Sequence, residues 1–320
     1  MKYKIIERDS FQWIDVVDPS HLEIEELAKE YNLHETSVED CLNPEHLPKF
    51  EKIGKYSFIV LRAFDEASHD DSDSVQELTR KVAVFYNENV LISIHRKDQD
   101  YLKKIRETWK IKVDQKEINE VEAGPLFFQV LHDVILGVVL SFDRPIENSM
   151  DILEKLEMGV FDARGAKPFA IEEGYYLKRK ASVFKRMLRF TMDILPKINS
   201  RPDTATFLQN LKEEAEVLYI YTDDLTESIN ALLNLHISLS TQKTTEASHQ
   251  INMIMRVLTI FSVFLLPLNL ITGIYGMNFE FMPELKWSFG YPFALFFMVF
   301  IEGAIYLWFR KQGWLWAKSK

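Results

Sequence analysis

Sixty-four consecutive residues, from Asp203 to Leu266, contain neither glycine nor proline. Both residue types interrupt helices, and apolar side chains such as Ile229, Leu232 and Leu233 recur in this stretch at helical spacing. A helix of this length would extend roughly 95 Å at ~1.5 Å per residue. Helices of globular proteins are far shorter. The stretch begins acidic and runs into strongly apolar sequence, so we expect one helix that leaves the aqueous phase and enters a membrane.

Two apolar runs lie near the end of the chain, Val257–Tyr275 and Tyr291–Phe309, each 19 residues long. A helix needs about 20 apolar residues to cross the ~30 Å hydrocarbon layer. Because the loop between the runs is short, we expect a hairpin through the membrane. The basic residues around this hairpin are Arg256, Lys286, Arg310, Lys311, Lys318 and Lys320. Only Lys286 lies in the loop, and this asymmetry predicts that both chain ends are cytosolic.

The remainder of the chain is predicted to be an acidic, water-exposed body. The chain has 38 Lys and Arg against 48 Asp and Glu, and the excess of acid falls in residues 1–250. An acidic surface repels phosphate backbones, so nucleic acid is not expected as a partner. Cys41 is the only cysteine, which excludes an internal disulfide and any multi-cysteine metal site. No apolar signal segment is present at the start, which favours a cytosolic location for this body.

Local patterns in the first hundred residues predict a small sheet with flanking helices. The runs rich in β-branched and aromatic residues are 11–19, 55–64, 79–87 and 89–95. Helical spacing follows Ser20, a plausible N-cap, and places Leu22, Leu27 and Tyr31 on one side. Further along, residues 126–140 are apolar nearly all round. We expect a buried core helix there rather than a membrane span, because the run is short and His132 interrupts it.

We therefore predict an α+β protein with a cytosolic α/β domain, a long helical stalk and two C-terminal transmembrane helices. The predicted parts are a cytosolic α/β domain (1–117), a cytosolic helical domain with the start of the stalk (118–250), the inner stalk end with the first transmembrane helix (251–275), an outer loop (276–290), the second transmembrane helix (291–309) and a basic cytosolic tail (310–320).

Two helices cannot enclose a pore, so conduction would require several copies around an axis, with one helix of each pair lining it. The first run is the better candidate because its small and polar residues share one stripe. That stripe consists of Asn252, Met255, Thr259, Ser262, Leu266, Asn269, Gly273 and Gly276. Small residues also allow helices to pack closely, and both roles are compatible. The second run is bulky and rich in phenylalanine, as expected for a lipid-facing helix.

The hairpin carries a motif that resembles a known family. "YGMN" (Tyr275–Asn278) followed by "FEFMPEL" (Phe279–Leu285) is similar to the signature of CorA divalent-cation channels. The resemblance also covers Asn252–Ile260 and, more loosely, Ser37–Phe64. It implies a funnel-shaped homopentamer in the cytoplasmic membrane that takes up Mg²⁺, and often Co²⁺ or Ni²⁺. It implies no cofactor other than Mg²⁺ as the transported and regulatory ion.

The same resemblance assigns the selectivity segment to Gly276, Met277 and Asn278. Mg²⁺ sheds water reluctantly, so an entry that holds the hydrated ion is favoured. A ring of Asn278 amide oxygens would accept hydrogen bonds from the bound waters, Gly276 would permit the bend that ends the helix, and Met277 would pack the mouth. Glu280 and Glu284 in the outer loop would raise the local concentration of cations.

Further inside, the resemblance implies a second polar ring at Asn252 and a hydrophobic gate at Met255, Leu258 and Leu266, which would close by dewetting. Thr259, Ser262 and Gly273 complete the expected lining. Asn269 is a departure, since family members commonly carry threonine there. Glu302 is a larger departure, because an acid within a transmembrane helix is expensive unless it is neutral or paired.

A regulatory Mg²⁺ site between subunits is implied at Glu39 and Asp40. The family's partner carboxylate lies on the stalk near Val217, which is not acidic here, so Glu216 is the candidate partner. Bound Mg²⁺ would bridge acids of adjacent subunits and hold the ring closed. Loss of the ion would then let these acids repel each other and widen the gate.

Three alternative functions can be weighed against the sequence. A zinc transporter of the same superfamily is the nearest, although the chain lacks the cysteine clusters that soft metals favour. A membrane-anchored enzyme is not expected, because the motifs His-Glu-x-x-His, Gly-x-Ser-x-Gly and Gly-x-x-x-x-Gly-Lys are all missing from the sequence. A scaffold that only oligomerises would also suit the long helix.

Overall fold

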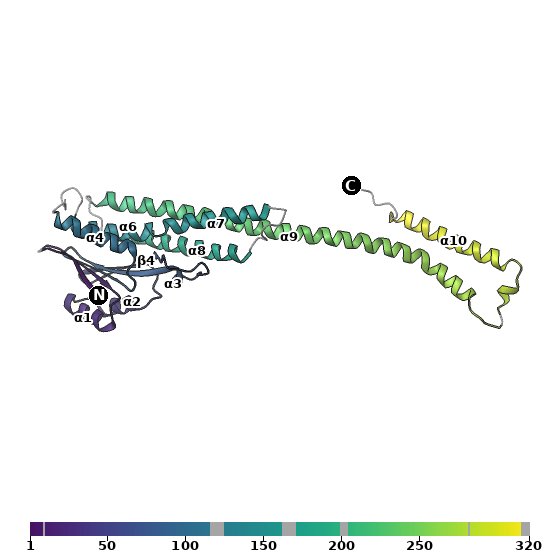
Figure 1. The fold of residues 1–320 in the computed structure, drawn as a ribbon, viewed down its shortest axis with the longest axis horizontal. Coiled ribbons are helices and arrows are strands. Elements are labelled where there is room, and N and C mark those ends of the chain that lie inside the picture. The colour runs from purple at the N-terminus through teal and green to yellow at the C-terminus, as the bar shows by residue number, and fades with distance from the viewer. Residues whose placement is uncertain (9, 116–124, 162–170, 199–203, 281, 315–320) are drawn as a thin grey trace. The chain divides into compact units, whose positions relative to one another are not determined.

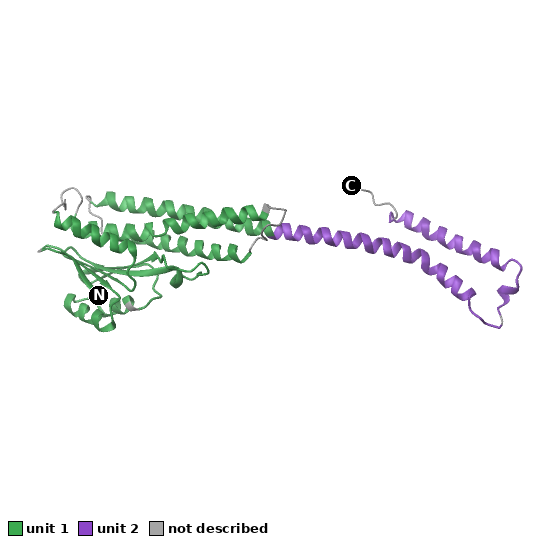
Figure 2. Ribbon diagram, in the orientation of Figure 1, with its two compact units in different colours: residues 1–236 green, residues 237–320 purple. Residues whose placement is uncertain are grey.

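The structure is a computed structural model that describes residues 1–8, 10–115, 125–161, 171–198, 204–280 and 282–314. Contacts divide the chain into two units, Met1–His236 and Ile237–Lys320 (Figure 2). The expected boundary between residues 117 and 118 lies outside the described residues. The expected boundary after residue 250 falls inside a continuous helix. The finer division of the chain stays a prediction.

Unit 1 contains a six-stranded sheet with the order β1-β2-β6-β5-β4-β3. The strands are β1 (Lys2–Glu7), β2 (Gln12–Val17), β3 (Lys49–Ile53), β4 (Tyr56–Phe64), β5 (Thr79–Tyr86) and β6 (Val90–His95). All neighbours are antiparallel except β2 and β6, which run parallel. Four strands coincide with the runs predicted from the sequence. β1 and β3 form the two edges and were not predicted, because their short sequences show little of the apolar alternation that marks a half-buried strand.

Helices cover both faces of this sheet (Figure 1). On one face lie α1 (His21–Tyr31) and α2 (Glu35–Leu42), which contribute Leu27 and Cys41 to a cluster with strand residues such as Phe58 and Phe85. The Ser20 side chain accepts from the Glu23 amide in a capping box, which confirms the predicted start of α1. The predicted buried side of this helix was wrong at Leu22, which is 72% exposed, because the turn of the helix points Ile24 and Leu27 at the sheet.

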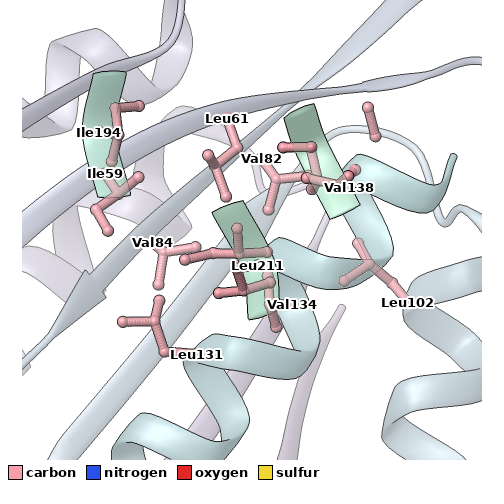
Figure 3. Packing of buried hydrophobic residues seen from close by; sticks show 14 of the residues in the cluster. Ile59, Leu61, Val82, Val84, Leu102, Leu131, Val134, Val138, Ile194 and Leu211 are labelled. Carbon is pink, nitrogen blue, oxygen red and sulfur yellow. The ribbon is translucent and has the colours of Figure 1, made fainter. Parts of the chain in front are cut away.

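The opposite face of the sheet packs on a layer of longer helices. They are α4 (Asp100–Asp114), α6 (Leu126–Leu140), α7 (Asp143–Phe161), α8 (Ile171–Ile194) and the first part of α9 (Ala205–Tyr275). Figure 3 shows β-strand side chains Ile59, Leu61, Val82 and Val84 against helical residues of this core. Two short helices, α3 (Val75–Leu78) and the 3₁₀ turn η1 (Leu195–Lys197), complete the unit. The sheet and the helices thus share one core, and the α+β class is confirmed.

Unit 2 consists of α9 from Ile237 onward, the 3₁₀ turn η2 (Pro283–Lys286) and α10 (Gly290–Lys311). α9 is a single helix of 71 residues, which confirms the long helix expected from the stretch without glycine or proline. It continues through Pro267 to Tyr275. α9 and α10 pack as a hairpin, with the rings of Phe264 and Phe309 stacked at 5.9 Å between centroids.

Three helical segments among the described residues are long and apolar enough to cross a membrane: Leu126–Val160, Ala205–Tyr275 and Gly290–Lys311. In the first segment, 50% of the most apolar 18-residue stretch is buried inside the protein. The corresponding values are 0% in the second segment and 11% in the third. Burial on this scale identifies Leu126–Leu140 as the core helix that was predicted. The α9–α10 hairpin therefore remains the predicted membrane part.

Candidate functional site

In unit 2, α9 has one face toward α10 and one face that is exposed among the residues that the structure describes. The partly buried residues recur every three or four positions and are Arg256, Ile260, Val263, Phe264, Pro267, Leu268, Ile271 and Tyr275. Arg256 donates to the backbone carbonyl oxygens of Gly313 and Trp314, just beyond α10. This face is therefore partly covered by packing within the chain.

The stripe predicted to line a pore lies on the opposite face. All of its members are exposed: Asn252, Met255, Thr259, Ser262, Leu266, Asn269, Gly273 and Gly276. Leu258, the remaining candidate gate residue, is also exposed. The proposed gate side chains are large apolar groups that are 54% (Met255), 59% (Leu258) and 66% (Leu266) exposed, as are other apolar residues of this helix such as Ile254 and Phe261. The fold thus brings every predicted lining residue to one face that a neighbouring copy or a pore could use.

The outer end of α9 is shaped by Gly276. The helix ends at Tyr275, and the Gly276 amide closes the last turn by donating to the Thr272 carbonyl oxygen at 2.9 Å. A Cβ placed on Gly276 would lie 3.1 Å from that same oxygen, which is closer than nine in ten of the contacts that Cβ atoms make in proteins. Met277 and Asn278 follow and are exposed. Within the described residues, the Asn278 amide makes no hydrogen bond, so it is available to a ligand.

The outer loop is braced against the start of α10. Pro283 begins η2, and the Trp287 ring packs at 5.8 Å between centroids from Phe293 of α10. The predicted cation-attracting side chains, Glu280 and Glu284, are exposed. The Glu284 backbone instead lies so close to Gly290 that a Cβ on this glycine would approach its carbonyl oxygen within 3.0 Å. The sequence reasoning missed Gly290, whose only signal was a glycine directly before the second apolar run.

The structure shows which side of α10 carries Glu302, the acid within the second apolar run. The residues of α10 that are buried or partly buried are Gly290, Ala294, Met298, Ile301, Glu302, Ile305 and Phe309. Glu302 therefore belongs to the side that packs in the hairpin and not to the exposed, phenylalanine-rich side. Its Oε1 atom is buried and has no hydrogen-bond partner within the described residues.

The candidate regulatory residues lie in unit 1. Glu39 and Glu216 are exposed, on α2 and α9. Asp40 is partly buried, and its carboxylate accepts from Lys49 Nζ at 2.5 Å and faces His46 Nε2 at 2.7 Å. Burial lowers the pKa of Lys49, but hydrogen bonds to Asp40 and Glu51 outweigh burial and raise it. No group of three or more His, Cys, Asp or Glu suited to a metal occurs among the described residues of one chain.

Comparisons with known proteins agree over nearly the whole chain. A model of the family "CorA-like Mg2+ transporter protein" matches residues 8–311. The cobalt/magnesium transport protein CorA of Thermotoga maritima is 25% identical over 311 residues, covering 95% of this chain and 83% of that protein. The putative metal ion transporter YfjQ of Bacillus subtilis is also 25% identical, with 95% and 90% covered. The complete structure of the CorA magnesium transporter from Methanocaldococcus jannaschii shares the fold, with a TM-score of 0.57 at 23% identity and 97% and 93% coverage.

Proposed function

Because the chain belongs to the family of CorA-like Mg²⁺ transporter proteins, we propose that it mediates Mg²⁺ uptake across the cytoplasmic membrane through the axis of a homopentamer. The family consists of membrane transporters for divalent cations and is not an enzyme family. The Thermotoga relative is named for cobalt and magnesium transport, so Co²⁺ is included as a second candidate ion.

One observation carries this proposal. The α9 face opposite α10 is exposed along its whole length from Asn252 to Gly276, and it holds most of the small and polar residues of this part of the helix. In a ring of copies, each α9 can turn this face to the axis while α10 covers the other face and meets lipid. Two helices alone cannot form a pore, so closure around an axis supplies what the single chain lacks.

Selection is proposed at Asn278, where the ring of copies would place several carboxamides around the entry. Mg²⁺ binds six waters tightly and gives them up slowly, so an unpaired amide oxygen is better used as an acceptor for these waters than as a direct ligand. Gly276 and Met277 position this residue at the helix end. Glu280 and Glu284, which are exposed beside it, attract cations in a salt-dependent manner.

The gate is proposed further inside, where Met255, Leu258 and Leu266 present apolar side chains on the same face as Asn252. Rings of such side chains hold the pore dry when it is narrow. We propose that Mg²⁺ in the cytosol stabilises the narrow state by bridging Asp40, together with Glu39, to Glu216 of a neighbouring copy.

Uptake of Mg²⁺ into proteoliposomes loaded with a fluorescent indicator tests the central step. Asn278→Ala is expected to reduce Mg²⁺ flux by about tenfold or more, the effect of a lost hydrogen bond of ~1.4 kcal/mol. Asn148→Ala, at an exposed position of α7, is the matched control and keeps full flux. Undiminished Mg²⁺ flux in Asn278→Ala would overturn the proposed selectivity ring.

Zinc transport is the second candidate function. Zn²⁺ accepts nitrogen and sulfur ligands and sheds water more readily than Mg²⁺, so a zinc path would not depend on an amide that holds a hydrated ion. Competition in the same proteoliposomes separates the two ions. Zn²⁺ flux that exceeds Mg²⁺ flux, and that persists in Asn278→Ala, favours the zinc function.

A further inference from the structure

A cavity of about 230 Å³ lies in unit 1, beside the face of the sheet that α1 and α2 cover. Its wall contains an unusual number of positive groups: Arg62, Arg80, Lys81, Arg96 and Lys97. The described residues that line it include no aspartate or glutamate. The remainder of the wall is largely apolar, with Ile24 and Ile94 as examples. This composition is opposite to the overall acidity of the chain, which has a formal charge of −10.

Three of these cations form a row across neighbouring strands. Arg62 of β4 lies directly opposite Lys81 of β5 in the antiparallel register. On the other side of β5, Val82 pairs with His95 of β6, so the next residue, Arg96, follows beside Lys81. Like charges at directly opposed positions destabilise a sheet. Repulsion within this row therefore destabilises the sheet unless other contacts compensate for it.

Neutral groups provide the partners of Arg62 and Lys81. Arg62 is only 2% exposed, and its five hydrogen bonds go to the Thr79 hydroxyl and to backbone carbonyl oxygens. Lys81 donates to the carbonyl oxygens of Asp40, at 2.5 Å, and Asn43, at the end of α2. The C-terminal dipole of α2 offers about half a negative charge, which is less than the two cations require.

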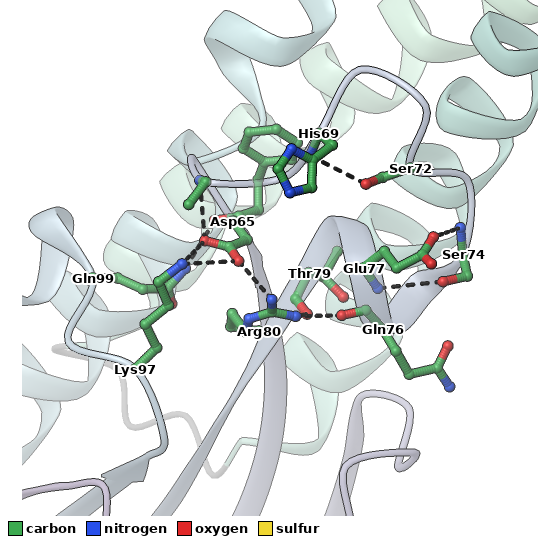
Figure 4. Close-up of polar contacts among 12 residues, drawn as sticks. Asp65, His69, Ser72, Ser74, Gln76, Glu77, Thr79, Arg80, Lys97 and Gln99 are labelled. Carbon is green, nitrogen blue, oxygen red and sulfur yellow. Dashed lines mark hydrogen bonds and ion pairs between the residues drawn. The ribbon is translucent and has the colours of Figure 1, made fainter.

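The nearby carboxylates are engaged elsewhere. Asp65 pairs with Arg80 at 2.8 Å and with Lys97 at 2.9 Å, as Figure 4 shows. The Asp40 side chain pairs with Lys49 and His46 on the outer side. Among the described residues, no carboxylate forms an ion pair with Arg62 or Lys81. Arg62 is buried and Lys81 is partly buried. A cation removed from water without a counter-ion is costly, and an anion from solution would reduce this cost.

The titration of Arg62 agrees with the excess of positive charge. Burial, followed by the charge of Arg80, lowers the pKa of Arg62 to about 10. This shift means that the positive charge of Arg62 is held at a cost, which an anion in the cavity would reduce.

We propose that this cavity is a binding site for the phosphate group of a small phosphorylated molecule. A phosphate monoester carries nearly two negative charges at neutral pH, which matches the two cations that lack a carboxylate. Lys81 makes two hydrogen bonds within the protein, so its third N–H is left for a phosphate oxygen. The volume lies below the ~300 Å³ of a typical drug-sized pocket, so only a small group fits beside the phosphate, against Ile24 and Ile94.

Calorimetric titration of the full-length protein in detergent tests the site. Inorganic phosphate and ethyl phosphate, a phosphate monoester with a small apolar group, are titrated separately in Mg²⁺-free buffer at constant ionic strength. Gln76 lines the cavity with an exposed side chain, so Gln76→Glu adds a negative charge without disturbing the core. We expect this variant to weaken binding by about tenfold or more, whereas Gln76→Ala binds like the wild type. Lys81→Gln is expected to weaken binding similarly, and Lys103→Gln, on the exposed side of α4, is its matched control.

The two ligands distinguish the source of the phosphate. Binding of inorganic phosphate that is lost in Gln76→Glu supports the site and identifies the free ion as sufficient. Binding of ethyl phosphate alone, with the same loss, supports the site and shows that the apolar wall contributes. Two results would overturn the proposal: no binding of either compound at high millimolar concentration, or equal weakening by Gln76→Glu and Gln76→Ala.

Discussion

The backbone carbonyl oxygen of Glu284 rests against Gly290, at a separation that leaves no room for a side chain on the glycine. This contact joins the outer loop to the first turn of α10. It places the loop with Glu280 and Glu284 by backbone packing, independently of their charges. The conformation of the loop beside Asn278 is therefore expected to depend on Gly290.

Gly290→Ala is predicted to displace the outer loop, because its Cβ would overlap the Glu284 carbonyl oxygen. Overpacking of this kind costs about 1–3 kcal/mol. We expect a lower melting temperature and reduced Mg²⁺ flux in proteoliposomes. Gly303→Ala on the same helix is the control, since a Cβ there meets nothing within 4 Å. Equal effects of the two substitutions would contradict the role of this contact.

Gly276→Ala is predicted to reduce flux, since its Cβ would crowd the Thr272 carbonyl oxygen at 3.1 Å and shift the start of the segment that carries Asn278. Gly273→Ala, one turn earlier, has open space around the new Cβ and serves as the comparison. The measurement is indicator uptake at several Mg²⁺ concentrations. A greater loss in Gly273→Ala than in Gly276→Ala would show that pore width at Gly273, and not the helix end, limits flux.

Glu302→Leu is predicted to raise the thermal stability of the protein, because it removes a buried carboxyl oxygen that has no partner within the described residues. Melting in detergent measures the effect, with Glu302→Gln as the isosteric control. A marked loss of stability in both variants would reveal a partner contributed by another copy.

Asp40→Asn is predicted to weaken the protection from proteolysis that Mg²⁺ confers, because it removes one charge of the proposed bridge between copies. The control is Lys49→Met, which removes the cation that Asp40 binds at 2.5 Å and leaves the carboxylate in place. If Asp40 binds Mg²⁺, this control strengthens the Mg²⁺ dependence. A similar loss in both variants would mean that Asp40 acts only through its ion pair with Lys49.

Asp15 is predicted to make the stability of unit 1 depend on pH. Burial raises its pKa, but hydrogen bonds from His95 and Ser93 and the charge of Arg106 outweigh burial and lower it below 3.8. The unfolded chain therefore takes up the proton first as the pH falls. The stabilisation is complete above an ordinary aspartate pKa and is lost as the pH falls through the folded value.

Asp15→Asn is accordingly expected to lower the free energy of unfolding by about 3 kcal/mol at neutral pH, because Arg106 loses a buried partner at 2.5 Å. The difference from the wild type should shrink below about pH 4. Thermal melts followed by circular dichroism across this range provide the measurement. A difference that stays constant with pH would show that the charge of Asp15 is not the cause.

The sequence by itself determined the features that depend on neighbours along the chain. The long α9, the two apolar runs of the α9–α10 hairpin and strands such as β4 and β5 follow from composition and periodicity, which act locally. The alignment of Asn252, Ser262 and Asn269 on one stripe also follows from the helical repeat alone.

Only the tertiary structure decided which face of each element meets another. It turned Glu302 toward the hairpin, exposed Leu22, set Gly290 against Glu284 and placed Arg62 opposite Lys81. Apart from the exposure of Leu22, these features depend on packing between elements or on strand register, which no local sequence pattern encodes. The physical reason is that side-chain direction repeats within an element, whereas the choice of partner depends on how separate elements fill space together.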